Sequence, residues 1–282
     1  MVATRAPGRG NMGRMERWIS VLVALGLGVT LAVTSSLGYG PIAFASGLLV
    51  FAFAFGWPRL TDSPQPWVTS FTLGGFGFAG MLATWLAVAP PYLEWLPVLA
   101  GLGLLWSFVQ HLARGIEASH AVANVSAQVA GIVITLSACT WIASLRLPGN
   151  HSAIYIGLAA IFLAQCATAL PWPARYTSPM AVFAGVVGAG IAHVFHPLPM
   201  VSLVVALVFG MVLGVIVAAT DRILGLIARA RFQATSLNEA RGVTKARTWG
   251  VQLALGAAPI ALSGVAVYAV HRLPAWAFIW FG

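Results

Sequence analysis

Three glutamines are the side chains most able to bind a polar solute within the long apolar stretches of this sequence. They are Gln128, Gln165 and Gln252, and the first and third lie at similar places in their stretches. An amide deep in a membrane helix can line a path for a solute, or it can hydrogen-bond to another helix, a contact worth about 0.6 kcal/mol on average. We favour the structural role and keep a substrate path as the functional hypothesis.

Histidines gather near the ends of apolar stretches that we place on the outer side of a membrane. His193 and His196 are three residues apart and would share one face of a helix, and imidazole is a common ligand of zinc and copper. No cysteine or carboxylate lies in the same short segment, and the only acidic residue expected on that side, Glu94, belongs to another part of the chain. His193 and His196 are therefore weak candidates, and we expect no metal.

Catalytic signatures are absent from the sequence. The chain has six acidic residues, which we place in loops or at helix ends, so no stretch carries a central carboxylate for proton transfer. It contains no phosphate-binding glycine loop with lysine, no paired cysteine motif, no HExxH and no GxSxG. We therefore expect a protein that is not an enzyme and that has no cofactor.

The composition indicates that lipid is the main solvent of this protein. Apolar residues make up 60% of the 282 residues and charged residues only 7%, whereas charged residues approach a quarter of a soluble chain. A net charge of +9 would point to nucleic acid in a soluble protein. In a membrane protein it follows from the retention of basic loops in the cytoplasm, so we expect membrane lipids and no nucleic acid as partners.

The apolar residues fall into nine stretches, each close to the roughly twenty residues that a helix needs to cross the hydrocarbon core. These stretches are 18–37, 41–57, 67–89, 95–113, 122–145, 151–171, 178–195, 199–220 and 249–270. With the N-terminus inside, thirteen of the fifteen basic residues fall on the cytoplasmic side. The sequence therefore predicts an all-α multi-pass protein of the bacterial cytoplasmic membrane, with its C-terminus outside.

Two basic segments border the apolar stretches on the cytoplasmic side. Residues 1–17 are typical of a disordered tail, and residues 221–248 form the longest polar segment between stretches. In that segment apolar residues recur at helical spacing beside Arg222, Arg229 and Arg231, which predicts an extension of the eighth helix or a separate interfacial helix. We expect these arginines to bind anionic lipid headgroups, with a protein partner as the alternative.

Two parts of the chain resemble each other. A Trp-Pro pair followed by arginine comes after the second and the sixth stretch, and a glycine-rich stretch follows each pair. The residues are Trp57, Pro58, Arg59 and Trp172, Pro173, Arg175. We interpret the resemblance as a duplication of four-helix units, 18–113 and 122–220, in the same orientation. Residues 249–282 then hold one extra helix and an aromatic end at the outer face of the membrane.

Small residues recur every four positions in three of the stretches. Such spacing lets helix backbones approach closely, which is how helices associate in lipid. We expect the third and seventh helices to line the contact between the two units. The residues assigned to helix packing are Gly75, Ala79, Gly185, Ala189, Gly210 and Gly214.

Two functions fit these observations. The first is a permease-like transporter whose solute or lipid passes between two similar units, by analogy with transporters built from parallel repeats. The second is a non-catalytic membrane subunit that scaffolds an envelope enzyme or exporter. A polar cavity that reaches Gln128 or Gln252 would favour the transporter, and a dry interface with an exposed groove of small residues would favour the scaffold.

Overall fold

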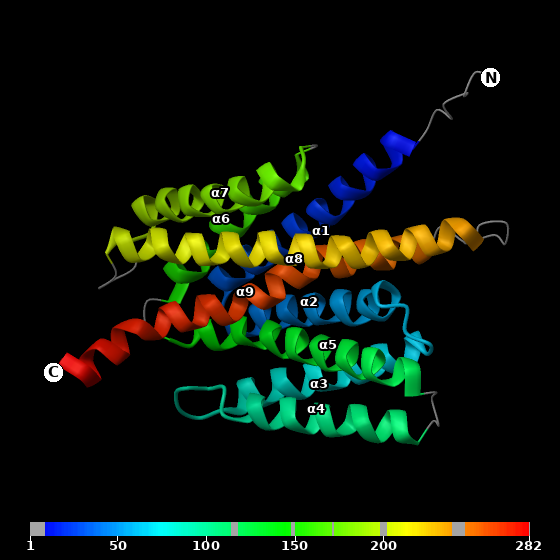
Figure 1. Cartoon of the computed structure of the whole chain (residues 1–282). Helices are drawn as coiled ribbons and strands as arrows, with labels where there is room; N and C mark the ends of the chain where they lie inside the picture. Colours follow the sequence, from blue (N-terminus) through cyan, green and yellow to red (C-terminus); the bar gives the residue numbers. More distant parts are fainter. Residues whose placement is uncertain are drawn as a thin grey trace.

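The protein is an all-α bundle in the computed structural model, which describes residues 9–113, 118–147, 150–170, 172–197, 202–238 and 246–281. Within these ranges it has nine helices and no strand (Figure 1). They are α1 (Arg9–Leu37), α2 (Tyr39–Leu60), α3 (Pro66–Leu86), α4 (Trp95–Leu112), α5 (Ala118–Leu145), α6 (Asn150–Ala169), α7 (Ala174–Phe195), α8 (Leu203–Asn238) and α9 (Ala246–Phe281). The predicted fold class is confirmed.

Eight of the described helices are long and apolar enough to cross a membrane. The exception is α3, whose 21 residues are rich in glycine, threonine and tryptophan, residue types that lower its mean hydropathy. It nevertheless runs alongside α2 and α4 from one end of the bundle to the other, and the start of α1 and the end of α9 lie at opposite ends (Figure 1). Which end faces the cytoplasm stays a prediction from the distribution of basic residues.

Three helices extend far beyond the apolar stretches from which they were predicted, namely α1, α8 and α9. Both α8 and α9 have 36 residues, about 54 Å at 1.5 Å per residue, whereas the hydrocarbon core is about 30 Å thick. The polar segment 221–248 therefore begins as an extension of α8, one of the two structures that its spacing predicted. The aromatic end of the chain continues α9 as helix to Phe281, and α1 begins at Arg9, within the predicted tail. Residues 1–8 lie outside the described residues.

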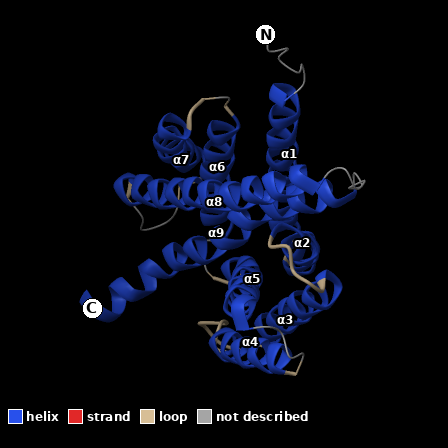
Figure 2. Cartoon of the chain, turned by 45° about the vertical axis from the view of Figure 1, so that its right-hand side comes forward, coloured by secondary structure: helices blue, strands red, loops and turns tan. Residues whose placement is uncertain are grey.

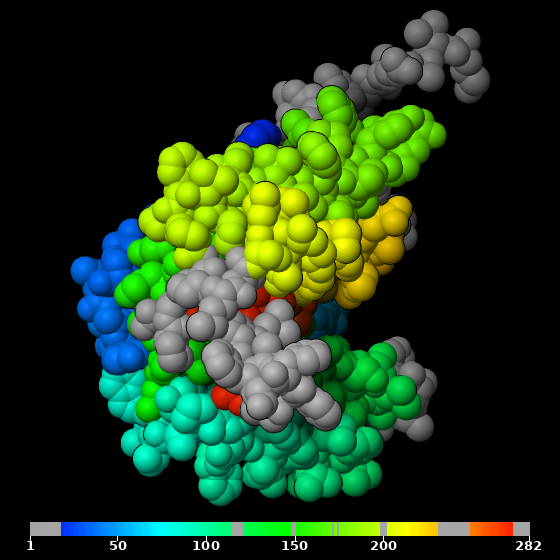
Figure 3. Space-filling view, turned by 90° about the vertical axis from the view of Figure 1, so that its left-hand side faces the viewer, coloured from blue at the N-terminus to red at the C-terminus, as the bar shows by residue number. Residues whose placement is uncertain are grey.

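The helices form two groups that meet around α9. We call α2, α3, α4 and α5, which pack against one another, the four-helix group, and α6, α7 and α8 the three-helix group. The two groups lie on opposite sides of α9 and α1 (Figures 1 and 2). Viewed from the end at which α9 finishes, α7 and α8 form the upper part of the surface, and α3 and α4 form the lower part (Figure 3).

This packing groups the helices differently from the units proposed from the sequence. The fifth helix packs extensively against α2, α3 and α4. Its packing against α6, the next helix of its proposed unit, is much smaller. The ninth helix, expected as an extra element, contacts α1, α2, α5, α6 and α8 and lies at the centre of the bundle. The duplication of 18–113 and 122–220 stays a prediction about the sequence.

The expectation that α3 and α7 line a contact between two units is wrong. The seventh helix packs against α6 and α8, whereas α3 packs against α2, α4 and α5, and the two lie on opposite sides of the bundle (Figures 1 and 2). Small-residue spacing indicates that a backbone will be approached closely, but it does not say by which helix. Both α3 and α7 pack against helices that lie on their own side of α9.

Close packing of α7 on α8 rests on the small residues assigned from the sequence. A Cβ atom added at Gly185 would lie 2.6 Å from the carbonyl oxygen of Gly210, and one added at Gly214 would lie 2.7 Å from Cα of Val182. Ala189 packs on Gly210 in the same seam. The third helix differs, because Gly75 is exposed with no atom within 4 Å of an added Cβ, and its packing residues are instead Gly77 and Gly80.

Substitution of these glycines tests the packing. We expect Gly185→Leu to lower the free energy of unfolding by about 3 kcal/mol or more, because the backbone of α8 leaves no room for a side chain. Gly75→Leu is the matched control, and we expect it to change stability by less than about 0.5 kcal/mol. Equilibrium unfolding in mixed detergent micelles measures both values. Equal losses for the two variants would contradict this packing.

Candidate functional site

The three glutamines predicted to line a path are all buried but lie on different helices. Gln128 on α5 is 3% exposed, Gln165 on α6 is 7% exposed and Gln252 on α9 is 4% exposed. No hydrogen bond among the described side chains joins them to one another. Gln165 accepts a hydrogen bond of 3.5 Å from Thr168 on its own helix. The structure therefore separates the three amides into different environments.

Gln128 has a partner that the sequence analysis did not single out. Its Nε2 donates to Oε1 of Gln110 on α4 at 2.6 Å, and both residues are buried. Nε2 of Gln110 has no partner among the described residues. Gln110 is visible in the sequence as an amide near the C-terminal end of the fourth stretch. Its position in the sequence does not reveal which helix it contacts. This pair joins α4 to α5 inside the four-helix group.

Gln252 lies where α9 crosses the C-terminal end of α2. A Cβ atom added at Gly56 would lie 2.4 Å from the carbonyl oxygen of Gly250 and 2.6 Å from the amide nitrogen of Ala254. The backbones of α2 and α9 are therefore in direct contact beside Gln252. Oε1 of Gln252 is buried and has no hydrogen-bond partner among the described residues. An unsatisfied buried acceptor costs about 1–3 kcal/mol, so this amide is one of the buried polar groups of the described structure that would gain from a partner.

Trp57, the residue after Gly56, joins α2 to α5 by a hydrogen bond. Its Nε1 donates to the carbonyl oxygen of Ala127 at 2.8 Å, and Gly131 provides the space for its ring. The tryptophan at the equivalent place of the proposed duplication, Trp172, is 50% exposed. The two Trp-Pro segments therefore have different surroundings in the structure.

The contact between α5 and α9 is closely packed along the middle of the bundle. Nε1 of Trp141 donates to the carbonyl oxygen of Ile260 at 3.0 Å, and Gly264 packs directly on Thr140. The hydroxyl groups of Thr140 and Ser263 are buried, and each donates to a carbonyl oxygen of its own helix. Because these hydroxyls are satisfied locally, they contribute to packing and leave no donor free for a solute.

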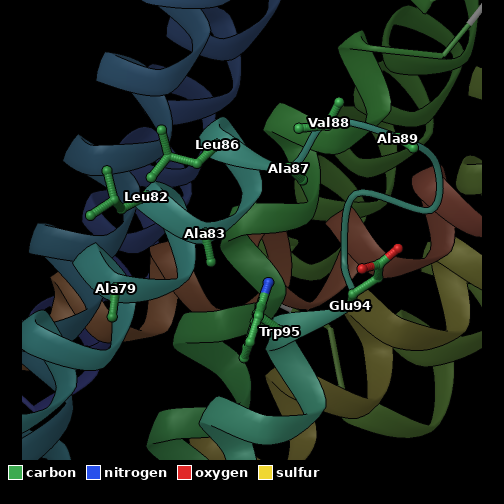
Figure 4. A pocket seen from close by; sticks show the side chains of 9 residues that line it. All are labelled: Ala79, Leu82, Ala83, Leu86, Ala87, Val88, Ala89, Glu94 and Trp95. Atoms are coloured by element: carbon green, nitrogen blue, oxygen red, sulfur yellow. The ribbon is translucent and has the colours of Figure 1, made fainter.

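A groove of about 560 Å³ lies at the other end of the bundle, between the end of α3, the loop after it and the start of α4 (Figure 4). The side chains that line it are apolar apart from the Glu94 carboxylate and the indole nitrogen of Trp95. The lining residues are Ala79, Leu82, Ala83, Leu86, Ala87, Val88, Ala89, Glu94 and Trp95. The sequence analysis noted Glu94 only as the sole outer acid and did not predict a groove.

The loop that borders this groove is fixed by contacts from α5 and α9. The guanidinium of Arg146 lies 4.1 Å from the centre of the Tyr92 ring and donates to the carbonyl oxygen of Thr84 at 2.8 Å. The hydroxyl of Tyr268 on α9 donates to the carbonyl oxygen of Pro91. The groove is thus a formed feature of the fold, held by residues from two other parts of the chain, Arg146 after α5 and Tyr268 on α9.

Two of the histidines pack against an aromatic ring at the end of the bundle. His196 packs against Tyr155, with ring centres 5.0 Å apart, and His151 lies 6.3 Å from the same ring. Within the described part of the chain, no group of three or more histidines, cysteines, aspartates or glutamates could hold a metal ion. His193 and His196 therefore have no third ligand there.

The basic residues assigned to lipid headgroups lie on the extension of α8. Arg222 and Arg229 are exposed, while Leu224 and Ala228 on the other face are buried in the core. This arrangement leaves the arginines facing away from the bundle, as lipid or partner binding would need. The side chain of Arg231 lies outside the described residues.

Comparison with known proteins identifies no relative of this chain. No protein-family model matches the chain, and no curated protein or solved structure matches it significantly. The architecture nevertheless identifies a broad class, because eight described helices are long and apolar enough to span a membrane. The chain has the architecture of a multi-pass membrane protein.

The amide pair can be tested by a double-mutant cycle. We expect Gln110→Leu and Gln128→Leu each to lower the free energy of unfolding by about 1–2 kcal/mol, because each leaves the other amide without its partner. The double variant should cost less than the sum of the two single variants, since no unpaired amide remains. Unfolding in mixed micelles gives the three values. Strictly additive losses would show that the two side chains do not interact.

Proposed function

We propose that this protein is a permease-like transporter in which the four-helix group and the three-helix group move relative to each other about α9. The transported substance would be a small solute or a lipid, and the proposal assigns the chain no catalytic role. The observation that supports it best is the position of α9, a central helix in contact with members of both groups. Many transporters alternate access by rocking one helix bundle against another around a fixed site.

The contacts between the groups favour such movement. Apart from α9 and α1, the groups meet only where α5 approaches α6 and where α2 approaches α8 among the described helices. Packing within each group is more extensive, as in the seam between α7 and α8. A structure of this kind can open between its groups at lower cost than within either of them.

Gln252 is the residue that we propose to meet the transported substance. It lies on α9 beside the backbone contact with α2, and its buried Oε1 has no partner in the described structure. A solute that donates a hydrogen bond, or a water molecule that precedes it, would satisfy this acceptor when the two groups move apart. Gln128 is the weaker candidate because it is already paired with Gln110.

A second function is favoured by a different observation. Gly74 and Gly75 on α3 and Gly101 on α4 have no atom within 4 Å of an added Cβ. Small residues that face outward can receive a helix of another protein, as a scaffolding subunit would require. Native mass spectrometry of the protein purified gently from its membrane separates the two functions: a stoichiometric second polypeptide supports the subunit, and recovery alone supports the permease.

Accessibility of Gln252 tests the permease proposal without knowledge of the substrate. We expect Gln252→Cys, with Cys139 and Cys166 replaced by alanine, to react in membranes with an impermeant maleimide. If the open state is populated at 0.1–10%, the rate should be roughly that fraction of the rate at an exposed position such as Ala113→Cys. Mass spectrometry of the labelled protein measures the rate.

The matched control is Ala257→Cys, which lies on the same helix and is 0% exposed. We expect it to stay unlabelled over the same period, because it lies within the packed core next to Ala258. Labelling of Gln252→Cys that is no faster than that of Ala257→Cys, in membranes and at any substrate tried, would contradict the proposal.

A further inference from the structure

The groove between α3 and α4 has the shape and polarity of a site for a single lipid. One wall is made by Ala79, Leu82 and Leu86, which follow one another along the last two turns of α3, with Ala79 farthest from the loop (Figure 4). Glu94 and Trp95 lie at its other end, at the start of α4. Tryptophan is enriched at the level of the headgroups, and Trp85 and Trp95, both substantially exposed, place this end of the groove at that level. An acyl chain would therefore lie along α3 and a headgroup beside Glu94.

Glu94 determines which headgroup the groove can accept. It occupies the N-cap position of α4, yet its side chain makes no capping hydrogen bond, and no ion pair of its carboxylate is found among the described residues. The carboxylate instead lines the groove and is exposed. A free carboxylate at headgroup level attracts an ammonium group and repels a phosphate that has no positive charge beside it. The indole of Trp95 next to it can also contact a cation through its ring.

We propose that this groove binds a phospholipid that carries an ammonium headgroup, such as phosphatidylethanolamine, with its ammonium at Glu94 and an acyl chain between α3 and α4. The rest of the protein would instead attract anionic headgroups, because the protein has a formal net charge of +9 and exposed arginines on the α8 extension. The groove would thus differ from the general lipid surface in the headgroup that it prefers. This inference holds whether or not the protein is a transporter.

Photolabelling with lipid probes tests the site directly. The full-length protein is placed in phosphatidylglycerol bilayers that contain a trace of phosphatidylethanolamine or phosphatidylglycerol with a diazirine in the acyl chain. We expect the ethanolamine probe to label residues 79–95 more strongly than the glycerol probe does. Glu94→Gln should reduce that preference by about two- to five-fold, the range of an exposed ion pair. Equal labelling by both probes in the unmodified protein, or a preference that persists in Glu94→Gln, would overturn the proposal.

Two further variants test the space within the groove independently of the charge of Glu94. Ala83→Leu should reduce labelling of residues 79–95 by both probes, because a larger side chain fills the groove. Gly101→Leu, on the exposed side of α4 with open space around an added Cβ, should leave labelling unchanged. Free ethanolamine should not compete, because it lacks the acyl chain that the apolar walls bind. Competition by ethanolamine would mean that the site binds the soluble amine and would overturn the lipid assignment.

Discussion

Direct contact between helix backbones is the constraint on which the rest of this structure depends. In lipid no hydrophobic force draws one apolar helix toward another, so association depends on van der Waals contact between surfaces that fit. Gly56 on α2 meets α9 at Gly250, and Gly264 on α9 meets α5 at Thr140. These contacts hold α9 against the four-helix group. A residue with a side chain at Gly56 or at Gly264 would push the helices apart and weaken the centre of the bundle.

The position of α9 has consequences for the whole molecule. A central helix that contacts both groups couples any movement of one group to the other. It also carries Gln252, whose buried side-chain oxygen has no partner among the described residues, so one of the unsatisfied polar groups lies on the helix that joins the groups. At the opposite end of α9, Tyr268 holds the loop that borders the lipid groove. The proposed path and the groove are therefore both supported by one element.

Much of the fold followed from the sequence, whereas the tertiary contacts did not. Hydropathy and length predict where helices begin and end in lipid, so the nine stretches correspond to the nine described helices. The extension of α8 was one of the two structures predicted for residues 221–248, whereas the helical continuation of α9 to Phe281 was not predicted, because an aromatic segment at a membrane surface has the same composition whether or not it is helical. Small-residue spacing marked Gly185, Gly210 and Gly214 as packing residues, but it could not identify α8 as the helix whose backbone approaches Gly185. The Gln110–Gln128 pair and the groove depend on which helices are neighbours, which a single sequence does not specify.

The distance between the two groups tests the central claim most directly. Spin labels at Phe78 on α3 and Phe183 on α7, both exposed, report this distance by pulsed electron paramagnetic resonance in lipid nanodiscs. A second pair within the three-helix group, at Phe183 and Met211 on α8, serves as the reference. Movement about α9 predicts two populations, or a broad distribution, for the first pair and one narrow population for the second. One narrow population for both pairs, under all conditions tested, would contradict a transporter that works by moving its two groups.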